Sequence, residues 1–330
     1  MTSPNPQDII TAIREIGTLP QSLTAVLQVI DNPNSGASEI AEVISRDTSL
    51  TSRVLKMVNS AQYGRTRHVS RVSEAVTVMG LNSIKVLALS SSLFSIRPDD
   101  ELFEQLNIKR MWRHFIETAS TARNIAEEIG YPDPEEAFVA GIMHDVGTIM
   151  MILYFKEEYM AVLNLLKEQR LGIIPIEEKL FGFNHCEVGL ALAKNWRLPG
   201  RVSFAIMHHH DPEPPDIIPE DTTLNNIVAL ADRIAMAPVD GYHPSIENDI
   251  KFIRATSKKL NLPAEAANRI RKTSLLQSII MCEFLELDFG DLMEVVTEAN
   301  NRLAEMYFSL ELVMVERDVL SRELDGSPVE

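Results

Sequence analysis

Apolar residues recur at intervals of three and four along most of the chain. In the first hundred residues this spacing is regular in the segments 23–30, 40–44 and 50–58. Such spacing places the apolar side chains on one face of an α-helix. No convincing run alternates apolar and polar residues in the manner of a half-buried strand. The sequence therefore predicts an all-α protein.

Three short sequences have the residue types that typically begin a helix. Asp133 is followed by a proline and two glutamates, which supplies an N-cap, a proline at the first helical position and an acid at the third. Asn184 is followed three residues later by a glutamate, so we expect a helix from His185 to about Trp196. Asp47 precedes a third apolar segment and is also a candidate N-cap.

The helical pattern divides into three parts. Residues 1–97 form short amphipathic segments, and the polar run Arg-Pro-Asp-Asp at 97–100 marks a boundary. Residues 98–290 contain the longer apolar segments and most of the histidines. Residues 291–330 contain one long helical pattern and a tail. We expect an N-terminal helical domain packed against a second helical bundle, with a long C-terminal helix.

The C-terminal segment 291–324 has an apolar repeat of 3.5 residues. Nine of its ten heptad positions are apolar, and Arg317 is the exception. A sustained 3.5-residue repeat is typical of coiled coils, which favours self-association through this helix. A terminal helix that packs back on its own bundle explains the same pattern, because further apolar residues widen the stripe. Both interpretations stay open at this point.

Composition and charge exclude several classes of partner. The chain has 330 residues, 45% of them hydrophobic, and a formal net charge of −16. This apolar content is sufficient for a sizeable core. A strongly acidic protein lacks the basic face that phosphate backbones require, so nucleic acid is not an expected partner. An anionic membrane surface is excluded on the same grounds.

Cysteine content and the N-terminal residues predict a cytoplasmic protein. The two cysteines, Cys186 and Cys282, lie far apart in helical patterns, which rules out a disulfide framework and a thiolate zinc site. The first ten residues lack the basic and apolar regions of a signal peptide. The longest apolar run, Ala137 to Leu153, predicts a buried core helix and not a membrane span, because two polar residues interrupt it.

Those two residues are His144 and Asp145, the only ionisable groups in that run. A buried carboxylate is costly unless it is paired or bound to a cation. An imidazole beside a carboxylate suits a first-row divalent metal ion. A hydrogen-bonded histidine–aspartate pair without metal would satisfy burial equally well.

Other candidate metal ligands occur on neighbouring predicted helices. They are His114, His185, His209, His210 and Asp232. Each has another explanation when taken alone. His114 fits a surface or core histidine, the run 208–210 fits a solvated helix end, and Asp232 fits an ion-pair partner of Arg233.

The order His…His-Asp…His…His-His…Asp resembles that of the HD superfamily of metal-dependent phosphohydrolases. Three motifs narrow the resemblance to the HDOD family, the HD-related output domains of bacterial signalling proteins, over roughly residues 10–290. They are Val58-Asn-Ser-Ala-Gln-Tyr-Gly64, Val72-Ser-Glu-Ala-Val-Thr-Val-Met-Gly-Leu81 and Phe138-Val-Ala-Gly-Ile-Met-His-Asp-Val-Gly147.

The resemblance implies a helical bundle that holds one or two divalent metal ions, iron, manganese or zinc. The implied metal ligands are His114, His144, Asp145, His185, His209, His210 and Asp232. The pair His209-His210 is preferred over His208-His209, because the paired histidines of the family immediately precede Asp-Pro.

Two departures from active relatives bear on catalysis. Phosphodiesterases of the related HD-GYP family commonly have a lysine three residues after the HD aspartate, where this chain has Thr148. They also carry a Gly-Tyr-Pro motif after the paired histidines, where this chain has Pro-Glu-Pro-Pro. A lysine at the first position would meet developing negative charge on a phosphoryl group. Its absence weakens the case for turnover.

The sequence therefore favours a regulatory signal-transduction protein that is non-catalytic or weakly catalytic. Its expected partner is a signalling protein, or a second copy of the chain through the C-terminal helix. The alternative is a metal-dependent phosphohydrolase that acts on a nucleotide or cyclic dinucleotide, which would also be its ligand. A third interpretation makes the metal purely structural. No glycine-rich P-loop identifies a substrate.

Overall fold

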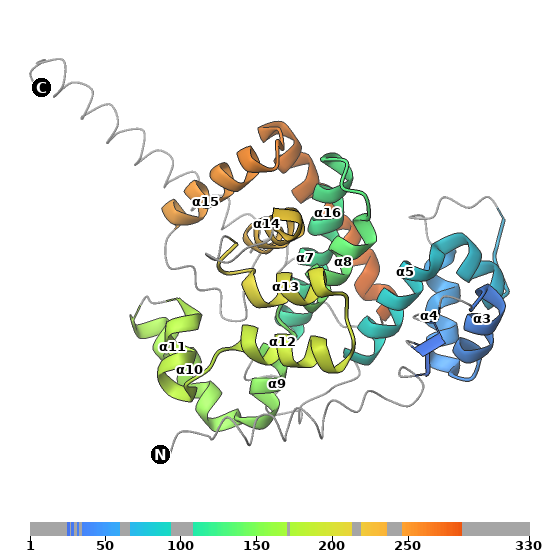
Figure 1. The fold of residues 1–330 in the computed structure, drawn as a ribbon, viewed down its shortest axis with the longest axis horizontal. Helices are drawn as coiled ribbons and strands as arrows, with labels where there is room; N and C mark the ends of the chain where they lie inside the picture. The colour runs from blue at the N-terminus through green and yellow to red at the C-terminus, as the bar shows by residue number, and fades with distance from the viewer. Residues whose placement is uncertain are drawn as a thin grey trace, which may run out of the picture.

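The computed structural model describes residues 35–59, 67–93, 108–169, 172–212, 219–235 and 246–285, with single positions between 25 and 32. Within these ranges the chain is helical apart from short connections, and no strand occurs (Figure 1). The prediction of an all-α fold is confirmed. The segment 97–100 and the C-terminal helix expected at 291–324 lie outside the described residues, so the domain division stays a prediction.

The N-terminal helices are α3 (Ala37–Ser45), α4 (Thr48–Val58) and α5 (Val72–Leu93). Asp47 caps α4 as predicted, because its side chain accepts a hydrogen bond of 2.9 Å from the backbone N–H of Leu50. Both α3 and α4 pack against α5. They form a small unit at one side of the molecule (Figure 1).

Helix α5 contains a kink at Gly80, which has φ of 78°. Side chains with a Cβ rarely adopt this left-handed backbone conformation, so glycine suits the position. Helix α5 contacts the second helical group through α8, and α4 contacts α16. Among the described residues, α5 and α4 therefore both connect the N-terminal helices to the second helical group.

The second group is built around α7 (Ile108–Glu128). This helix packs against α8 (Pro134–Met143), α14 (Pro219–Ile234) and α16 (Ala264–Leu285), and α15 (Ile246–Lys259) packs on α14. Apolar side chains of α7 are fully buried at helical spacing. They include Met111, Phe115, Ile116, Ala119, Ala122 and Ile125. This central position explains why polar residues on α7 face the interior of the bundle.

The remaining helices are α9 (Val146–Tyr154), α10 (Lys156–Gln169), α11 (Ile173–Phe181), α12 (His185–Asn195) and α13 (Gly200–His208). Helix α12 packs against both α9 and α13, and α10 packs against α11 (Figure 1). The predicted helix start is confirmed, since α12 begins at the first residue after its cap. The cap and the acid three residues later form a capping box.

The apolar run from Ala137 to Leu153 is not the single helix that its composition predicts. Helix α8 ends at Met143 and α9 begins at Val146, so His144 and Asp145 lie in the break between them. Apolar residues continue on both sides because both helices are buried. The whole stretch Pro134–Tyr154 is long and apolar enough to cross a membrane, but 83% of its most apolar window is buried within the described molecule.

Candidate metal centre

The structure brings together all seven side chains that the sequence singled out. His114 lies on α7 and Asp232 on α14, while His144 and Asp145 lie in the break between α8 and α9. His185 is the first residue of α12. The pair that follows α13 is His209 and His210. Five separate parts of the helical bundle therefore meet at one cluster.

Two glycines allow the helices to approach closely enough to form this cluster. A Cβ at Gly147 of α9 would overlap the backbone carbonyl of His185 on α12. A Cβ at Gly141 of α8 would lie 2.7 Å from the Cα of Ala119 on α7. Both separations are shorter than real Cβ atoms tolerate. The glycines therefore permit the break at residues 144–145 to face α7 on one side and α12 on the other.

One half of the cluster combines imidazole with carboxylate. The Nε2 atom of His114 lies 3.2 Å from Nε2 of His144 and 3.1 Å from Oδ1 of Asp232. The Nε2 atom of His144 lies 3.3 Å from Oδ2 of Asp145. We call His114, His144, Asp232 and this Asp145 oxygen the carboxylate half.

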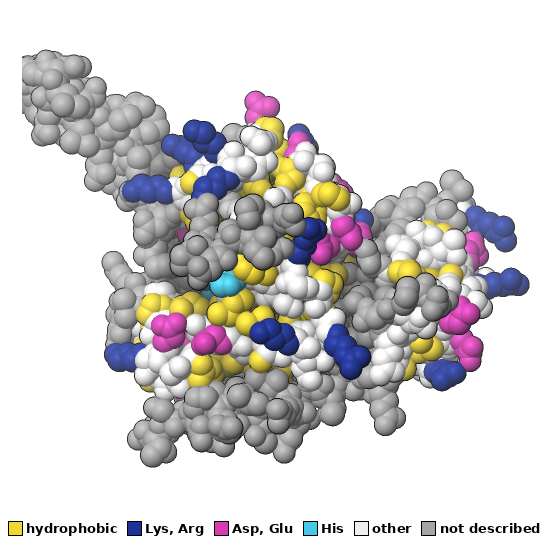
Figure 2. Space-filling model, in the orientation of Figure 1, with side chains coloured by type: hydrophobic (Ala, Val, Ile, Leu, Met, Phe, Trp, Pro, Cys, Tyr) yellow, Lys and Arg dark blue, Asp and Glu magenta, His cyan; other side chains and the backbone are white. Residues whose placement is uncertain are grey.

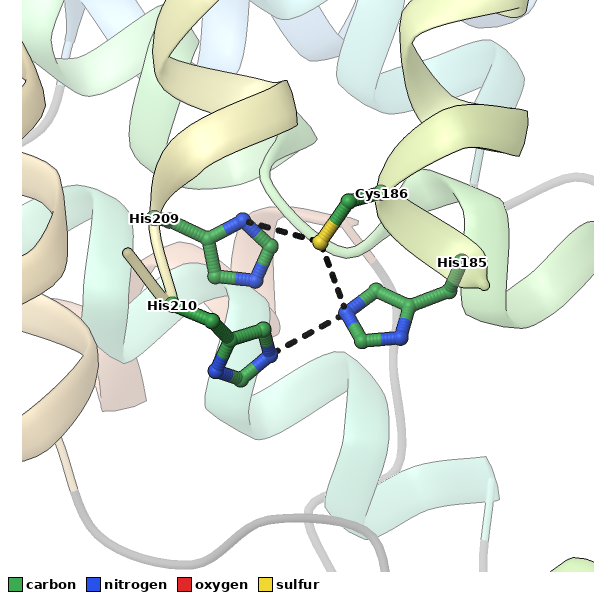
Figure 3. Close-up of side chains that lie close together, drawn as sticks. All are labelled: His185, Cys186, His209 and His210. Atoms are coloured by element: carbon green, nitrogen blue, oxygen red, sulfur yellow. Dashed lines mark hydrogen bonds between the residues drawn. The ribbon is translucent and has the colours of Figure 1, made fainter. Parts of the chain in front are cut away.

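The other half is richer in imidazole. The Nε2 atoms of His185 and His209 lie 3.2 Å and 3.3 Å from Oδ1 of Asp145. Nε2 of His185 is also 3.1 Å from Nε2 of His210 (Figure 3). We call these three histidines and this oxygen the imidazole half. The two oxygens of Asp145 thus face different halves, which places the carboxylate between them.

Backbone carbonyls orient two of the imidazoles. The Nδ1–H of His144 donates to the carbonyl of Gly141 at 2.7 Å, and that of His209 donates to the carbonyl of Ile206 at 2.9 Å. In each case the acceptor lies three residues earlier, at the end of the same helix. With Nδ1 used as a donor, Nε2 faces the cluster and can bind a metal ion that displaces its proton, as in histidines that bind metals.

A buried carboxylate that the sequence analysis missed orients a third imidazole. Oε2 of Glu177 accepts a 2.7 Å hydrogen bond from Nδ1–H of His185 and a 2.9 Å bond from its backbone N–H. Glu177 lies on α11, is 0% exposed, and its other oxygen accepts from Tyr159 at 3.3 Å. Helical periodicity does not distinguish Glu177 from other acidic residues, because only the packing of α11 brings its carboxylate to His185.

A second missed residue is Cys186, which is 3% exposed. Its Sγ atom lies 3.5 Å from Nε2 of His185 and 3.9 Å from Nδ1 of His209 (Figure 3). The number and separation of the cysteines exclude a site built from several thiolates, but not one thiol among several imidazoles. The useful signal was the place of Cys186 directly after a candidate ligand in the first turn of a helix.

The structure distinguishes between the three consecutive histidines. His209 and His210 enter the cluster, as preferred from the sequence. His208 instead stacks on Phe204, with 4.5 Å between the ring centroids, and is only partly buried. The side chains of Asp145 and Asp232 keep 17% and 12% exposure. Figure 2 shows an imidazole at the surface beside hydrophobic side chains.

Charge in the protein without metal is divided between the carboxylates and the imidazoles. Burial alone would raise the pKa of Asp145, but His144 and the other imidazoles hold that pKa well below its usual range. Burial alone would lower the pKa of His144, but the Asp145 carboxylate outweighs it and raises the pKa to about 10. Burial would also lower the pKa of His209, but Cys186 and then Asp145 outweigh it and raise that pKa to about 9. The pKa of Asp232 is also lowered, against burial, by His114 and His144.

The donor set fits divalent metal ions. In the described part of the chain, Oδ1 of Asp145 and Nε2 of His209 are buried and make no hydrogen bond, although they lie 3.3 Å apart. Two ligands on one metal, each with a bond of about 2.0–2.2 Å, lie roughly 3 Å apart when they are adjacent. The separations of 3.1–3.3 Å in both halves match that value. Imidazole and carboxylate together suit zinc, iron and manganese.

Comparison with known proteins supports the fold. The HDOD domain matches residues 16–212. An uncharacterised protein of Treponema pallidum is 28% identical over 240 residues, which is 72% of this chain and 45% of that protein. The chain spans less than half the length of the curated relatives that it matches.

Two solved structures share the arrangement. One, from Geobacter sulfurreducens, is an HDOD domain protein of unknown function. It aligns with a TM-score of 0.63 and 25% identity over 85% of this chain and 99% of its own. The other, from Shewanella amazonensis, is provisionally assigned as a phosphohydrolase. It aligns with a TM-score of 0.66 and 22% identity over 84% of this chain and 97% of its own. At 22% identity the second likeness shows the fold alone.

Proposed function

The chain belongs to the HDOD family, and we propose that it is a regulatory protein whose histidine–aspartate cluster binds divalent metal ions. The observation that carries this proposal is the position of Asp145, with one oxygen in each half of the cluster. A carboxylate in this position suits a bridge between two ions. The ligands would be the seven residues that the sequence singled out, and the metals iron, manganese or zinc.

Metal binding would act on the packing of the bundle. The ligands come from α7, α14, the α8–α9 break, α12 and the end of α13. An ion held between them favours the arrangement in which these helices are drawn together, and a ligand that binds one arrangement better shifts the population towards it. A signalling partner, or a second copy of the chain, would read that arrangement. This is a regulatory use of the cluster that requires no turnover.

Thr148 supports a regulatory rather than a catalytic role. It lies three residues after Asp145 in α9 and is 1% exposed. Its neutral side chain stands where active HD-GYP relatives commonly have a lysine. Bound divalent ions can activate water and stabilise developing charge. Turnover also benefits from preorganised cations near the reacting phosphoryl oxygens, and loss of one such donor typically costs about 10²–10³ in rate. We therefore expect metal binding with little or no hydrolysis.

The test compares wild type with His144→Ala and with His68→Ala, a control at an exposed histidine. Each protein is loaded with manganese or ferrous iron and assayed on cyclic dinucleotides and simple phosphoesters, and its metal content is measured. We expect the wild type and the control to retain metal without appreciable turnover. A wild-type turnover of about 1 s⁻¹ or more, in the ordinary range of enzymes, that vanishes in His144→Ala would establish the phosphohydrolase alternative. A wild type that binds no metal would refute the proposal.

A further inference from the structure

Cys186 occupies a defined place beside the imidazole half. It is the second residue of α12, and its backbone N–H donates to the capping side chain of Asn184 at 3.0 Å. The cap therefore fixes the backbone from which the thiol projects. Figure 3 shows Sγ lying between the rings of His185 and His209, with His210 across from it. The thiol thus faces the same small volume as the three imidazoles.

The distances suit a sulfur ligand. Bonds of about 2.3 Å to sulfur and 2.0–2.1 Å to nitrogen, at a tetrahedral angle, place the two ligand atoms roughly 3.5 Å apart. Sγ of Cys186 lies 3.5 Å from Nε2 of His185. Ligand atoms of His185, Cys186, His209 and His210 all lie within 4.8 Å of one another. One ion can therefore be reached by all four side chains after small adjustments.

A second observation points independently to a cation here. Nε2 of His209 is buried and has no hydrogen-bond partner within the described residues. Its ring is already oriented by the bond from Nδ1–H to the carbonyl of Ile206. Nε2 therefore faces the cluster, 3.3 Å from Oδ1 of Asp145, and offers its lone pair once its proton is displaced. A buried polar atom without a hydrogen-bond partner is costly, and a metal ion that displaces the proton would satisfy Nε2.

We infer that Cys186 is a metal ligand, and that it makes the imidazole half a thiolate–imidazole site that prefers zinc. This inference rests on the proposed metal binding and goes beyond it, because the HDOD resemblance implies no cysteine ligand. Thiolate and imidazole are soft or borderline donors that favour zinc over manganese. On binding, the S–H bond breaks, a sulfur–metal bond forms and the proton leaves to solvent. The carboxylate half, with its oxygen ligands, remains suited to iron or manganese.

Cobalt(II) is the probe, since it takes zinc sites and gives a near-ultraviolet charge-transfer band when bound to thiolate. Metal-free full-length wild type, Cys186→Ala and Cys282→Ala are titrated with cobalt(II) and followed by absorption spectroscopy. Cys282 is the matched control, being the other buried cysteine of the chain and lying on α16. We expect the charge-transfer band in wild type and Cys282→Ala, and its loss in Cys186→Ala.

The other outcomes separate this inference from the proposed function. Cobalt d–d bands in wild type without a charge-transfer band would overturn the thiolate ligand and leave metal binding intact. A wild type that shows no cobalt bands at all would overturn both. A charge-transfer band that persists in Cys186→Ala and vanishes in Cys282→Ala would also overturn the inference.

The inference can also be tested on the wild-type protein, so that the result does not depend on whether a variant folds. X-ray absorption of zinc-loaded wild type should show a sulfur scatterer at about 2.3 Å from zinc. Nitrogen and oxygen scatterers alone would contradict the inference. Competition titrations would measure the change in zinc affinity. Removal of an outer-shell partner typically lowers metal affinity by about 10–100-fold. Loss of the direct ligand in Cys186→Ala should weaken zinc by at least that factor and leave manganese binding unchanged.

Discussion

The carboxylate half and the imidazole half share one aspartate but differ in almost everything else. The carboxylate half is assembled from α7, α14 and the break after α8, and its second carboxylate is Asp232. The imidazole half is assembled from α12 and the end of α13, with a thiol beside it. Two sets of ligands with different chemistry therefore meet at Asp145. On the proposal above, donor sets of different chemistry on the two sides of one aspartate would prefer different metal ions.

Replacement of Asp145 by asparagine should have the largest effect, because this residue serves both halves. The amide removes the negative charge that faces His144 on one side and His185 on the other. We expect Asp145→Asn to lose metal from both halves, as measured by metal content per chain after dialysis. Asp232→Asn is the comparison, since it should empty only the carboxylate half. Equal losses in the two variants would break the distinction between the halves.

Replacement of the two close-packed glycines, Gly147 and Gly141, should affect the two halves differently. Gly147→Ala should displace α9 from α12, because its Cβ would overlap the carbonyl of His185. Overpacking of this kind typically costs about 1–3 kcal/mol and sometimes more. Urea unfolding should show that loss, and zinc binding should weaken more than manganese binding. Gly141→Ala, which strains the contact of α8 with α7, should show the opposite selectivity.

Glu177→Gln should have a smaller effect that is confined to the imidazole half. Glutamine keeps a hydrogen-bond acceptor for Nδ1–H of His185 but removes the charge. Loss of such an outer-shell partner typically lowers metal affinity by about 10–100-fold. Calorimetric titration with zinc should show this decrease, and manganese affinity should not change. Glu178→Gln is the neighbouring control, because Glu178 contacts Asn184 and no imidazole of the cluster.

The smallest expected difference between the two halves is in the pH dependence of metal binding. The pKa of His144 is raised to about 10 and that of His209 to about 9, so both imidazoles hold their second proton at neutral pH. Metal must displace these protons, so affinity should rise as the pH increases towards about 9–10. The pKa of His185 is also raised, which predicts more protons released from the imidazole half. Calorimetry in buffers of different ionisation enthalpy measures the number of protons released on metal binding. A metal affinity that does not change with pH would contradict this charge distribution.

Local features of the fold could be predicted from the sequence because they depend on neighbours in the chain. The caps at Asp47, Asp133 and Asn184 are confirmed for this reason, since each side chain bonds a backbone N–H two or three residues later. The order of histidines and aspartates identified the residues of the cluster. Helical periodicity alone does not predict that these residues lie close together. The family resemblance does, because it implies a bundle that holds them at one site.

Other features depend on contacts between distant helices. The break at His144 and Asp145 was missed because buried apolar residues continue on both sides of it. Glu177 was missed because α11 must pack near the start of α12 before its carboxylate reaches His185. Cys186 was dismissed on the cysteine count, although its thiol lies beside His185, the preceding residue, and near His209 and His210, which follow α13.

Anomalous X-ray diffraction from metal-loaded crystals tests the central claim most directly. Two ions that share a carboxylate typically lie about 3.5–4 Å apart. We predict two anomalous peaks at that separation, one beside His114 and His144 and one beside His185, with Asp145 between them. The zinc absorption edge should further assign zinc to the peak nearest Cys186. A single peak, or none in crystals grown with excess metal, would contradict the account of two halves that share Asp145.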